Sequence, residues 1–152
     1  MNDKLEIIEV INRYLAALDK HTFDVETFKK IFVNNAKVVR PNGQELTGPQ
    51  EISSSHAKSM DRFRATQHLT SGFIINSVDE ANSDFRVNII ALHFWKEGFG
   101  DQKLKKDDNY FLAGGVFTGT VTKTDDDWQI STIRNDVLWR QGVGFKEMLN
   151  TK

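Results

Sequence analysis

The sequence predicts an α+β protein, because its apolar residues change their spacing partway along the chain. Residues 4–63 place apolar side chains three or four positions apart, which is typical of helices with one buried face. Residues 65–138 instead form four long stretches whose apolar residues alternate with period two or run almost continuously. Helices followed by long strands favour helices packed on one curved, mostly antiparallel sheet. There is no internal repeat or linker, and we expect one domain over residues 1–152.

The first helix is expected over Lys4–Asp19. Asp3–Glu6 resembles a capping box with an acidic first turn, which favours a helix start. The apolar stripe that follows is Ile8, Ile11, Leu15 and Leu18. Tyr14 lies beside this stripe, and Asp19 stands at the carboxyl end, where the helix dipole disfavours a carboxylate. An acid in that place is unusual without electrostatic support.

Two shorter helices are expected before the long strands. Thr22 or Asp24 can cap the second helix, and Gly48-Pro49 opens the third with proline in its first turn. The predicted buried positions are Val25, Phe28, Ile31 and Phe32 in the second helix, and Ile52, His56, Met60 and Phe63 in the third. We expect His56 to be a half-buried packing residue.

The predicted strands comprise a short pair and four long segments. Ala36–Arg40 and Glu45–Thr47 are expected to pair across a Pro-Asn-Gly turn. The long strands are Ala65–Asn76, Ser83–Trp95, Asn109–Lys123 and Trp128–Leu138. The glycines of the third long strand allow bulges and sharp curvature. A glycine-containing tail, residues 142–152, follows the last strand.

The first two long strands place histidines on faces that can line a pocket. By strand alternation one face of the first carries Thr66, His68, Thr70 and Gly72, a small polar surround for an imidazole. One face of the second carries Phe85, Val87, Ile89, Ala91, His93 and Trp95. The opposite face of the second strand is also largely apolar, so we expect both faces to be covered.

Composition excludes several function classes. The formal net charge is −1 without a long run of one sign, which argues against nucleic acid as a partner. The chain has no cysteine, so thiolate nucleophiles, disulfides and cysteine-bound metals are excluded. No apolar run reaches membrane-spanning length, and the N-terminus lacks the apolar core of a signal peptide. We therefore expect a cytoplasmic protein that binds neither nucleic acid nor membrane.

The chain resembles the SnoaL-like branch of the nuclear-transport-factor-two-like superfamily. The matching segments are Tyr14–Asp19, Leu46–Gly48, Thr66–Leu69, Asp126–Ile130 and Leu138–Gly142, in this order and spacing. The resemblance implies a cone: a strongly curved mixed β-sheet closed by three N-terminal helices around a deep pocket. The family includes scytalone dehydratase, the bile-acid dehydratase, polyketide cyclases and hexachlorocyclohexane dehydrochlorinase.

The resemblance also implies a catalytic pair. In the dehydratase and dehydrochlorinase members, an aspartate ending the first helix and a histidine opening the first long strand act together. Those positions match Asp19 and His68, and a family tyrosine one turn earlier matches Tyr14. His93 matches a second pocket histidine of scytalone dehydratase. The bile-acid enzyme has an aspartate where this chain has Ala91, so this chain lacks that enzyme's full set.

The chemistry expected of these residues is proton abstraction from carbon, followed by elimination or isomerisation. Imidazole is a base near neutral pH, and a carboxylate on its other nitrogen sets the tautomer. The expected substrate is a small, apolar, cyclic or polyketide-like molecule, and the step needs no cofactor. The candidate substrate contacts are His93, Thr70, Phe63, Ala91 and Trp95.

Other interpretations of the same residues stay open. The fold also hosts non-catalytic ligand-binding domains and oligomerisation modules. A histidine bonded to the carboxylate favours catalysis, and one bonded only to backbone favours simple binding. Asp19, His68 and His93 have the composition of a metal site, although we expect no metal. A homodimer is also expected, because strands that are apolar on both faces need a partner on the outer one.

Overall fold

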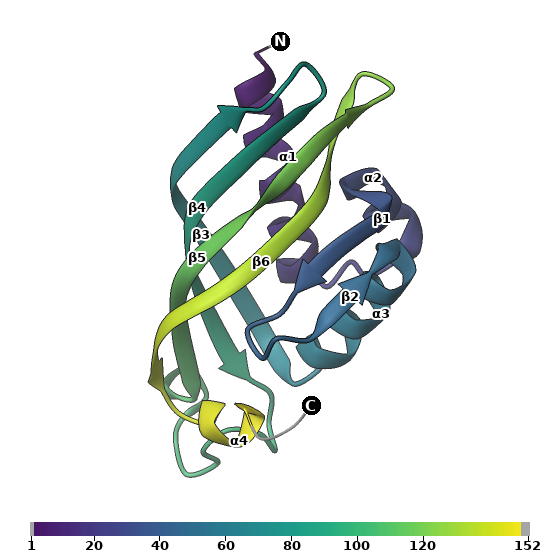
Figure 1. Cartoon of the computed structure of the whole chain (residues 1–152). Helices are drawn as coiled ribbons and strands as arrows, with labels where there is room; N and C mark the ends of the chain where they lie inside the picture. The colour runs from purple at the N-terminus through teal and green to yellow at the C-terminus, as the bar shows by residue number, and fades with distance from the viewer. Residues whose placement is uncertain (1, 150–152) are drawn as a thin grey trace.

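The computed structural model of the chain describes residues 2–149. Its elements in chain order are α1 (Asp3–Asp19), α2 (Val25–Ile31), β1 (Phe32–Val39), β2 (Glu45–Thr47), α3 (Gly48–Met60), β3 (Phe63–Ser77), β4 (Asn82–Trp95), the 3₁₀ turn η1 (Lys106–Asp108), β5 (Tyr110–Thr124), β6 (Asp127–Gly142) and α4 (Phe145–Leu149). Figure 1 shows the long strands β3–β6 twisting together, with α1 along one side and α4 at the end opposite the N-terminus. The predicted α+β class is confirmed. The short helix α4 lies in the predicted tail, whose residues 150–152 are outside the described part.

The six strands form one curved, unclosed mixed sheet in the order β2-β1-β6-β5-β4-β3. β1 runs parallel to β6, and every other neighbouring pair is antiparallel. This is the curved, helix-covered sheet of the cone that the resemblance implies. It leaves β2 and β3 as the two edge strands.

The helix boundaries differ from the predicted ones in three places. Asn2, rather than Asp3, caps α1, because its side chain accepts the Lys4 backbone N–H at 2.9 Å. Asp3 instead accepts the indole N–H of Trp128 at 3.1 Å, which ties the start of α1 to β6. Asp24 caps α2, and Phe32 begins β1 directly after that helix. Phe63 begins β3 rather than lying on the third helix, because α3 ends at Met60.

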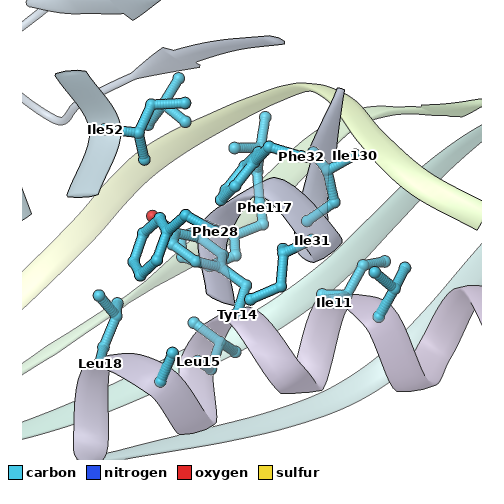
Figure 2. Close-up of a cluster of buried hydrophobic side chains, with 14 of the residues drawn as sticks. Ile11, Tyr14, Leu15, Leu18, Phe28, Ile31, Phe32, Ile52, Phe117 and Ile130 are labelled. Carbon is cyan, nitrogen blue, oxygen red and sulfur yellow. The ribbon is translucent and has the colours of Figure 1, made fainter. Parts of the chain in front are cut away.

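The core fills the space between the helices and the inner face of the sheet. Figure 2 shows Ile11, Tyr14, Leu15 and Leu18 projecting from α1 toward side chains of α2 and the sheet. Phe28, Phe32 and Ile130 are fully buried there. The aromatic members meet edge-on or stacked, as Tyr14 and Phe32 do at 5.0 Å between ring centroids. The phenylalanine-rich composition therefore serves mainly as core, with some rings left to line a cavity.

Strand β3 changes the face that it turns inward at Gly72. A register shift against β4 between Ser71 and Ile74 inserts one extra residue, which is a β-bulge. Gly72 occupies the bulge with a φ of +68°. Thr66, His68 and Thr70 face the helices before the bulge, and Phe73 and Ile75 pack against the core after it. The prediction that Gly72 shares the His68 face is therefore wrong.

The outer face of the sheet carries a row of apolar side chains. Leu69 pairs with Ile90, Ile90 with Gly114, and Gly114 with Trp139, so one line crosses β3, β4, β5 and β6. Leu69 is 49% exposed, Ile90 40% and Trp139 43%. The indole of Trp139 lies directly over Gly114, where any Cβ would collide with the ring. The predicted alternation of β4 is confirmed on its inner face, while this apolar outer row is uncovered in a single chain.

We expect Gly72→Ala to destabilise the fold by about 1–2 kcal/mol, the cost of a left-handed backbone for an L residue. The added Cβ would also lie 2.8 Å from the side-chain amide nitrogen of Asn88. Urea denaturation measures the change in the free energy of unfolding. Ser71→Ala, in the exposed preceding position, is the control and should stay within about 0.5 kcal/mol of the wild type. Equal stabilities for the two variants would contradict the role assigned to the bulge.

Candidate active site

A cavity of about 160 Å³ opens between the helices and the inner face of the sheet. Its apolar wall includes Leu18, Met60, Phe63, Ile89, Phe111, Phe117 and Ile133. Its polar wall includes Tyr14, His56, His68, His93 and Asn135, which come from α1, α3, β3, β4 and β6. A cavity of this size holds one benzene-sized ring. The site is thus an apolar chamber with a few convergent polar groups, the usual form of a small-molecule site.

Asp19 and His68 meet at the wall of this chamber. His68 Nδ1 lies 2.6 Å from Asp19 Oδ1. The same carboxylate accepts the Thr66 hydroxyl at 2.9 Å and the His68 backbone N–H at 2.9 Å. His68 lines the cavity and Asp19 does not, so the carboxylate stands behind the ring. With Nδ1 bound to the carboxylate, Nε2 is the nitrogen left for a ligand.

The hydrogen bonds explain how a carboxylate is tolerated at the end of α1. Burial by itself raises the pKa of Asp19, but hydrogen bonds from His68 and Thr66 and the charge of His68 outweigh it. The net result is a pKa below the ordinary aspartate value. Asp19 is therefore ionised at neutral pH, which favours the His68 tautomer with its proton on Nδ1.

Tyr14 is paired with His56 rather than with His68. Its hydroxyl lies 2.6 Å from His56 Nε2, and both residues are buried. Burial lowers the pKa of His56 to about 3, helped by the positive charge of Arg40, and burial raises the pKa of Tyr14. Both groups are uncharged at neutral pH and face the cavity as hydrogen-bonding groups. His56 is therefore a buried cavity residue, not the half-buried packing residue predicted from sequence.

His93 lines the cavity between Phe111 and His68. Its ring stacks on Phe111 at 4.2 Å between centroids and meets the His68 ring edge-on at 6.1 Å. Its Nδ1 is buried and has no hydrogen-bond partner among the described residues. Burial lowers the pKa of His93 to about 3, and the nearby charge of His68 contributes. A neutral imidazole with an unused nitrogen can contact a polar ligand group.

The remaining candidate contacts divide into two groups. Phe63 and Ala91 line the cavity beside His93, so both stay candidates for substrate contact. Thr70 and Trp95 do not line it. The Thr70 hydroxyl donates to Asn12 of α1 at 2.9 Å, and the Trp95 indole donates to the Val143 carbonyl at 2.8 Å. These hydrogen bonds connect elements of the fold, and neither residue lies on the cavity wall where the sequence analysis expected a substrate contact.

Sequence reasoning missed several cavity residues. Asn135 of β6 has a buried Oδ1 without a partner among the described residues, and it lines the cavity. Arg40, Arg62 and Arg140 also line it, from the end of β1, the link after α3 and the end of β6. None of these has a spacing that marks it in sequence, because each comes from a different element. Within residues 2–149, no three His, Asp or Glu side chains converge as a metal-binding group.

The low pKa of His93 gives a testable pH dependence. A histidine whose pKa is about 3 when folded and near 6.5 when unfolded takes up a proton on unfolding between these values, so stability falls as pH falls through this window. We expect His93→Phe, which keeps the stack on Phe111, to reduce proton uptake on unfolding at pH 5 by about one proton. The slope of the unfolding free energy against pH measures this uptake. Leu92→Met is the control and should keep the wild-type slope. An unchanged slope in His93→Phe would refute the low pKa of His93.

Comparison with known proteins places the chain in a family. The model of the SnoaL-like domain matches residues 1–134. Similar solved structures include the Kfla4162 protein from Kribbella flavida, which is 19% identical over 91% of this chain and 93% of that chain, with a TM-score of 0.79. The LinA-type3 hexachlorocyclohexane dehydrochlorinase from Novosphingobium barchaimii is 14% identical over 91% and 88%, with a TM-score of 0.77. A proposed scytalone dehydratase from Novosphingobium aromaticivorans is 20% identical over 91% and 86%, with a TM-score of 0.75.

At these identities the solved structures establish the shared fold. No curated protein matches the chain. Among the described helices, none has the length and apolar character needed to cross a membrane. The family match covers most of the chain and agrees with the resemblance read from Tyr14–Asp19 and Thr66–Leu69. The chain belongs to the SnoaL-like family.

Proposed function

We propose that the protein is a cofactor-independent lyase or isomerase that removes a proton from carbon in a small, largely apolar substrate. The observation that carries this proposal is the 2.6 Å contact between His68 Nδ1 and Asp19 Oδ1, with His68 facing an apolar cavity. A ring bonded only to backbone would favour simple binding. Here the ionised side-chain carboxylate holds the ring, which is the arrangement that supports a general base.

The proposed reaction begins at His68 Nε2. This nitrogen takes a proton from an acidic carbon, and the C–H electron pair becomes the new double bond as a neighbouring group leaves with its bonding electrons. The imidazolium that forms lies against the Asp19 carboxylate, which stabilises it. A leaving hydroxide takes this proton from the His68 imidazolium and departs as water, whereas a leaving halide departs as the anion and His68 then releases its proton to solvent. In an isomerisation His68 returns the proton to another carbon.

The neutral groups of the cavity supply the second half of the mechanism. Tyr14, His93 and Asn135 line the wall as uncharged hydrogen-bonding groups. Hydrogen bonds donated by Tyr14 or His93 to a substrate carbonyl would stabilise the negative charge that develops as the proton leaves. Among residues 2–149, His93 Nδ1 and Asn135 Oδ1 have no hydrogen-bond partner, so both are available to a ligand, and Asn135 Oδ1 can accept from a substrate hydroxyl.

The comparisons support the same reaction class. Two similar structures carry names of elimination enzymes, a dehydrochlorinase and a proposed scytalone dehydratase. The alternative is a non-catalytic ligand-binding module of the same fold. The carboxylate bound behind the ring, at an unusual position at the end of α1, favours catalysis over that alternative.

We expect His68→Ala to abolish turnover and Asp19→Asn to lower it by roughly two to four orders of magnitude, because the base or its orienting charge is lost. The assay follows elimination by NMR in deuterated water on a panel of cyclic β-hydroxy ketones and chlorinated cyclohexanes. The same spectra report deuterium exchange at acidic carbons when no group leaves.

Thr70→Val is the matched control on the same strand. Its hydroxyl bonds Asn12 and lies off the cavity, so activity should be retained. Turnover that survives in His68→Ala, or a wild-type protein that binds panel members without exchange or elimination, would favour the binding-module alternative.

We also infer that two copies associate through the outer row of Leu69, Ile90, Gly114 and Trp139. These residues are cross-strand neighbours, so they form one continuous apolar line rather than scattered exposures. A sheet face with such a line is stabilised by covering it, and a second copy presents the same line in return.

We expect light scattering to report a dimer of the wild type and a monomer of Ile90→Lys at the same concentration, because a buried lysine in this row lacks a partner charge. Asn88→Lys is the control on the same strand and face, in an exposed polar position. A monomeric wild type at high micromolar concentration would exclude this interface.

A further inference from the structure

The mouth of the cavity is formed by arginines. A second, larger depression of about 810 Å³ lies beside the catalytic chamber. Arg40, Arg62 and Arg140 line both spaces, together with Pro41, Ser59 and Met148. Residues that border both spaces mark the passage between them. A ligand that enters the chamber from this depression passes three guanidinium groups on its way to His68.

These arginines have no carboxylate partner among the described residues. Arg40 Nη1 donates to the Ser55 hydroxyl at 3.0 Å, and Arg62 Nε donates to the Ser59 carbonyl at 3.2 Å. Other arginines of the chain do pair with acids, such as Arg64 with Asp107 at 2.8 Å. Since guanidinium groups usually make several bonds to anions, those of the mouth retain unused donors.

Nearby acids do not balance this charge. Within the described part of the chain, no Asp or Glu lines the inner chamber. Glu51 is the only acid among the residues lining the outer depression, where Lys58 adds a further cation. The Glu51 carboxylate accepts the Thr47 backbone N–H at the start of α3. The formal net charge of the whole chain is −1, so this local positive excess does not follow from overall composition.

Holding the arginines together has an electrostatic cost. Burial lowers the pKa of Arg40, and burial followed by the charge of Arg40 lowers the pKa of Arg62. Partly buried like charges repel each other unless an anion lies between them. A bound carboxylate or phosphate would remove that cost and accept charge-assisted hydrogen bonds from the guanidinium donors.

We propose that the ligand is amphipathic, with an acidic group held at the mouth by Arg40, Arg62 and Arg140 and an apolar ring or chain inside the chamber. The chamber fits one ring, and its wall of Phe63, Phe111 and Phe117 carries no charge. The placement of the reactive carbon at His68 rests on the proposed function. The recognition of the acidic group does not, because it depends on the arginines alone.

Matched probes test the proposal by isothermal titration calorimetry. Phenylacetate and phenylacetamide have the same ring and nearly the same shape but differ in charge. We expect the wild type to bind phenylacetate at least about tenfold more tightly, because hydrogen bonds to a charged group are stronger than neutral ones. Phenyl phosphate, run in parallel, shows whether carboxylate or phosphate ester is preferred. Inorganic phosphate alone should bind more weakly than phenyl phosphate, since it leaves the chamber unfilled.

In the double variant Arg62→Gln/Arg140→Gln, the ratio of the affinity for phenylacetate to the affinity for phenylacetamide should fall toward one. Arg134→Gln is the control, because Arg134 lies on the same strand as Arg140 but is 61% exposed and paired with Asp136. His68→Ala should keep the preference, which separates acid recognition from catalysis. Equal affinity for the acid and the amide in the wild type would overturn the proposal even if elimination activity is found. If inorganic phosphate bound as tightly as phenyl phosphate, the proposal that an apolar group occupies the chamber would be overturned.

Discussion

The carboxylate of Asp19 joins the helical layer to the sheet, and the geometry of the site depends on it. It accepts two hydrogen bonds from side chains, Thr66 and His68, and one from the backbone N–H of His68. Strand β3 is an edge strand. The backbone N–H of His68 therefore has no neighbouring strand whose carbonyl could accept it. One acid therefore covers an open edge amide and orients the imidazole. A carboxylate at the carboxyl end of a helix is tolerated because these donors offset the unfavourable dipole.

The neutral histidines set the electrostatic character of the chamber. Burial keeps His56 and His93 uncharged at neutral pH. The negative charge of Asp19 stands behind His68, and the positive charges of three arginines stand at the mouth of the chamber. His68 can therefore accept a proton beside the Asp19 carboxylate. The arginines are concentrated at the opening, where the acidic group of a ligand would lie.

Much of the fold could be predicted from sequence because its signals are local. The apolar stripe of α1, the Gly-Pro start of α3 and the alternation of β4 each lie within one element. The Asp19 and His68 pairing came from a family resemblance. Alternation failed beyond Gly72, since one extra residue in a bulge reverses the inward face. Alternation put Thr70 on the correct face, but could not show that its hydroxyl meets α1 instead of the cavity. The arginine mouth assembles from three separate elements, and no single-element pattern reports it.

The parallel pairing of β1 with β6 has a consequence for how the protein acquires its binding site. Val38 of β1 lies beside Ile133 of β6, so the hydrogen bonds between these two strands cannot form until β6 has been synthesised. Contacts between segments so distant in sequence slow folding, because the chain loses loop entropy before these contacts stabilise it. Arg40 directly follows β1, and Asn135 and Arg140 lie in β6. Ligand recognition is thus among the last properties to emerge as the chain is synthesised, because Asn135 and Arg140 arrive with the last strand.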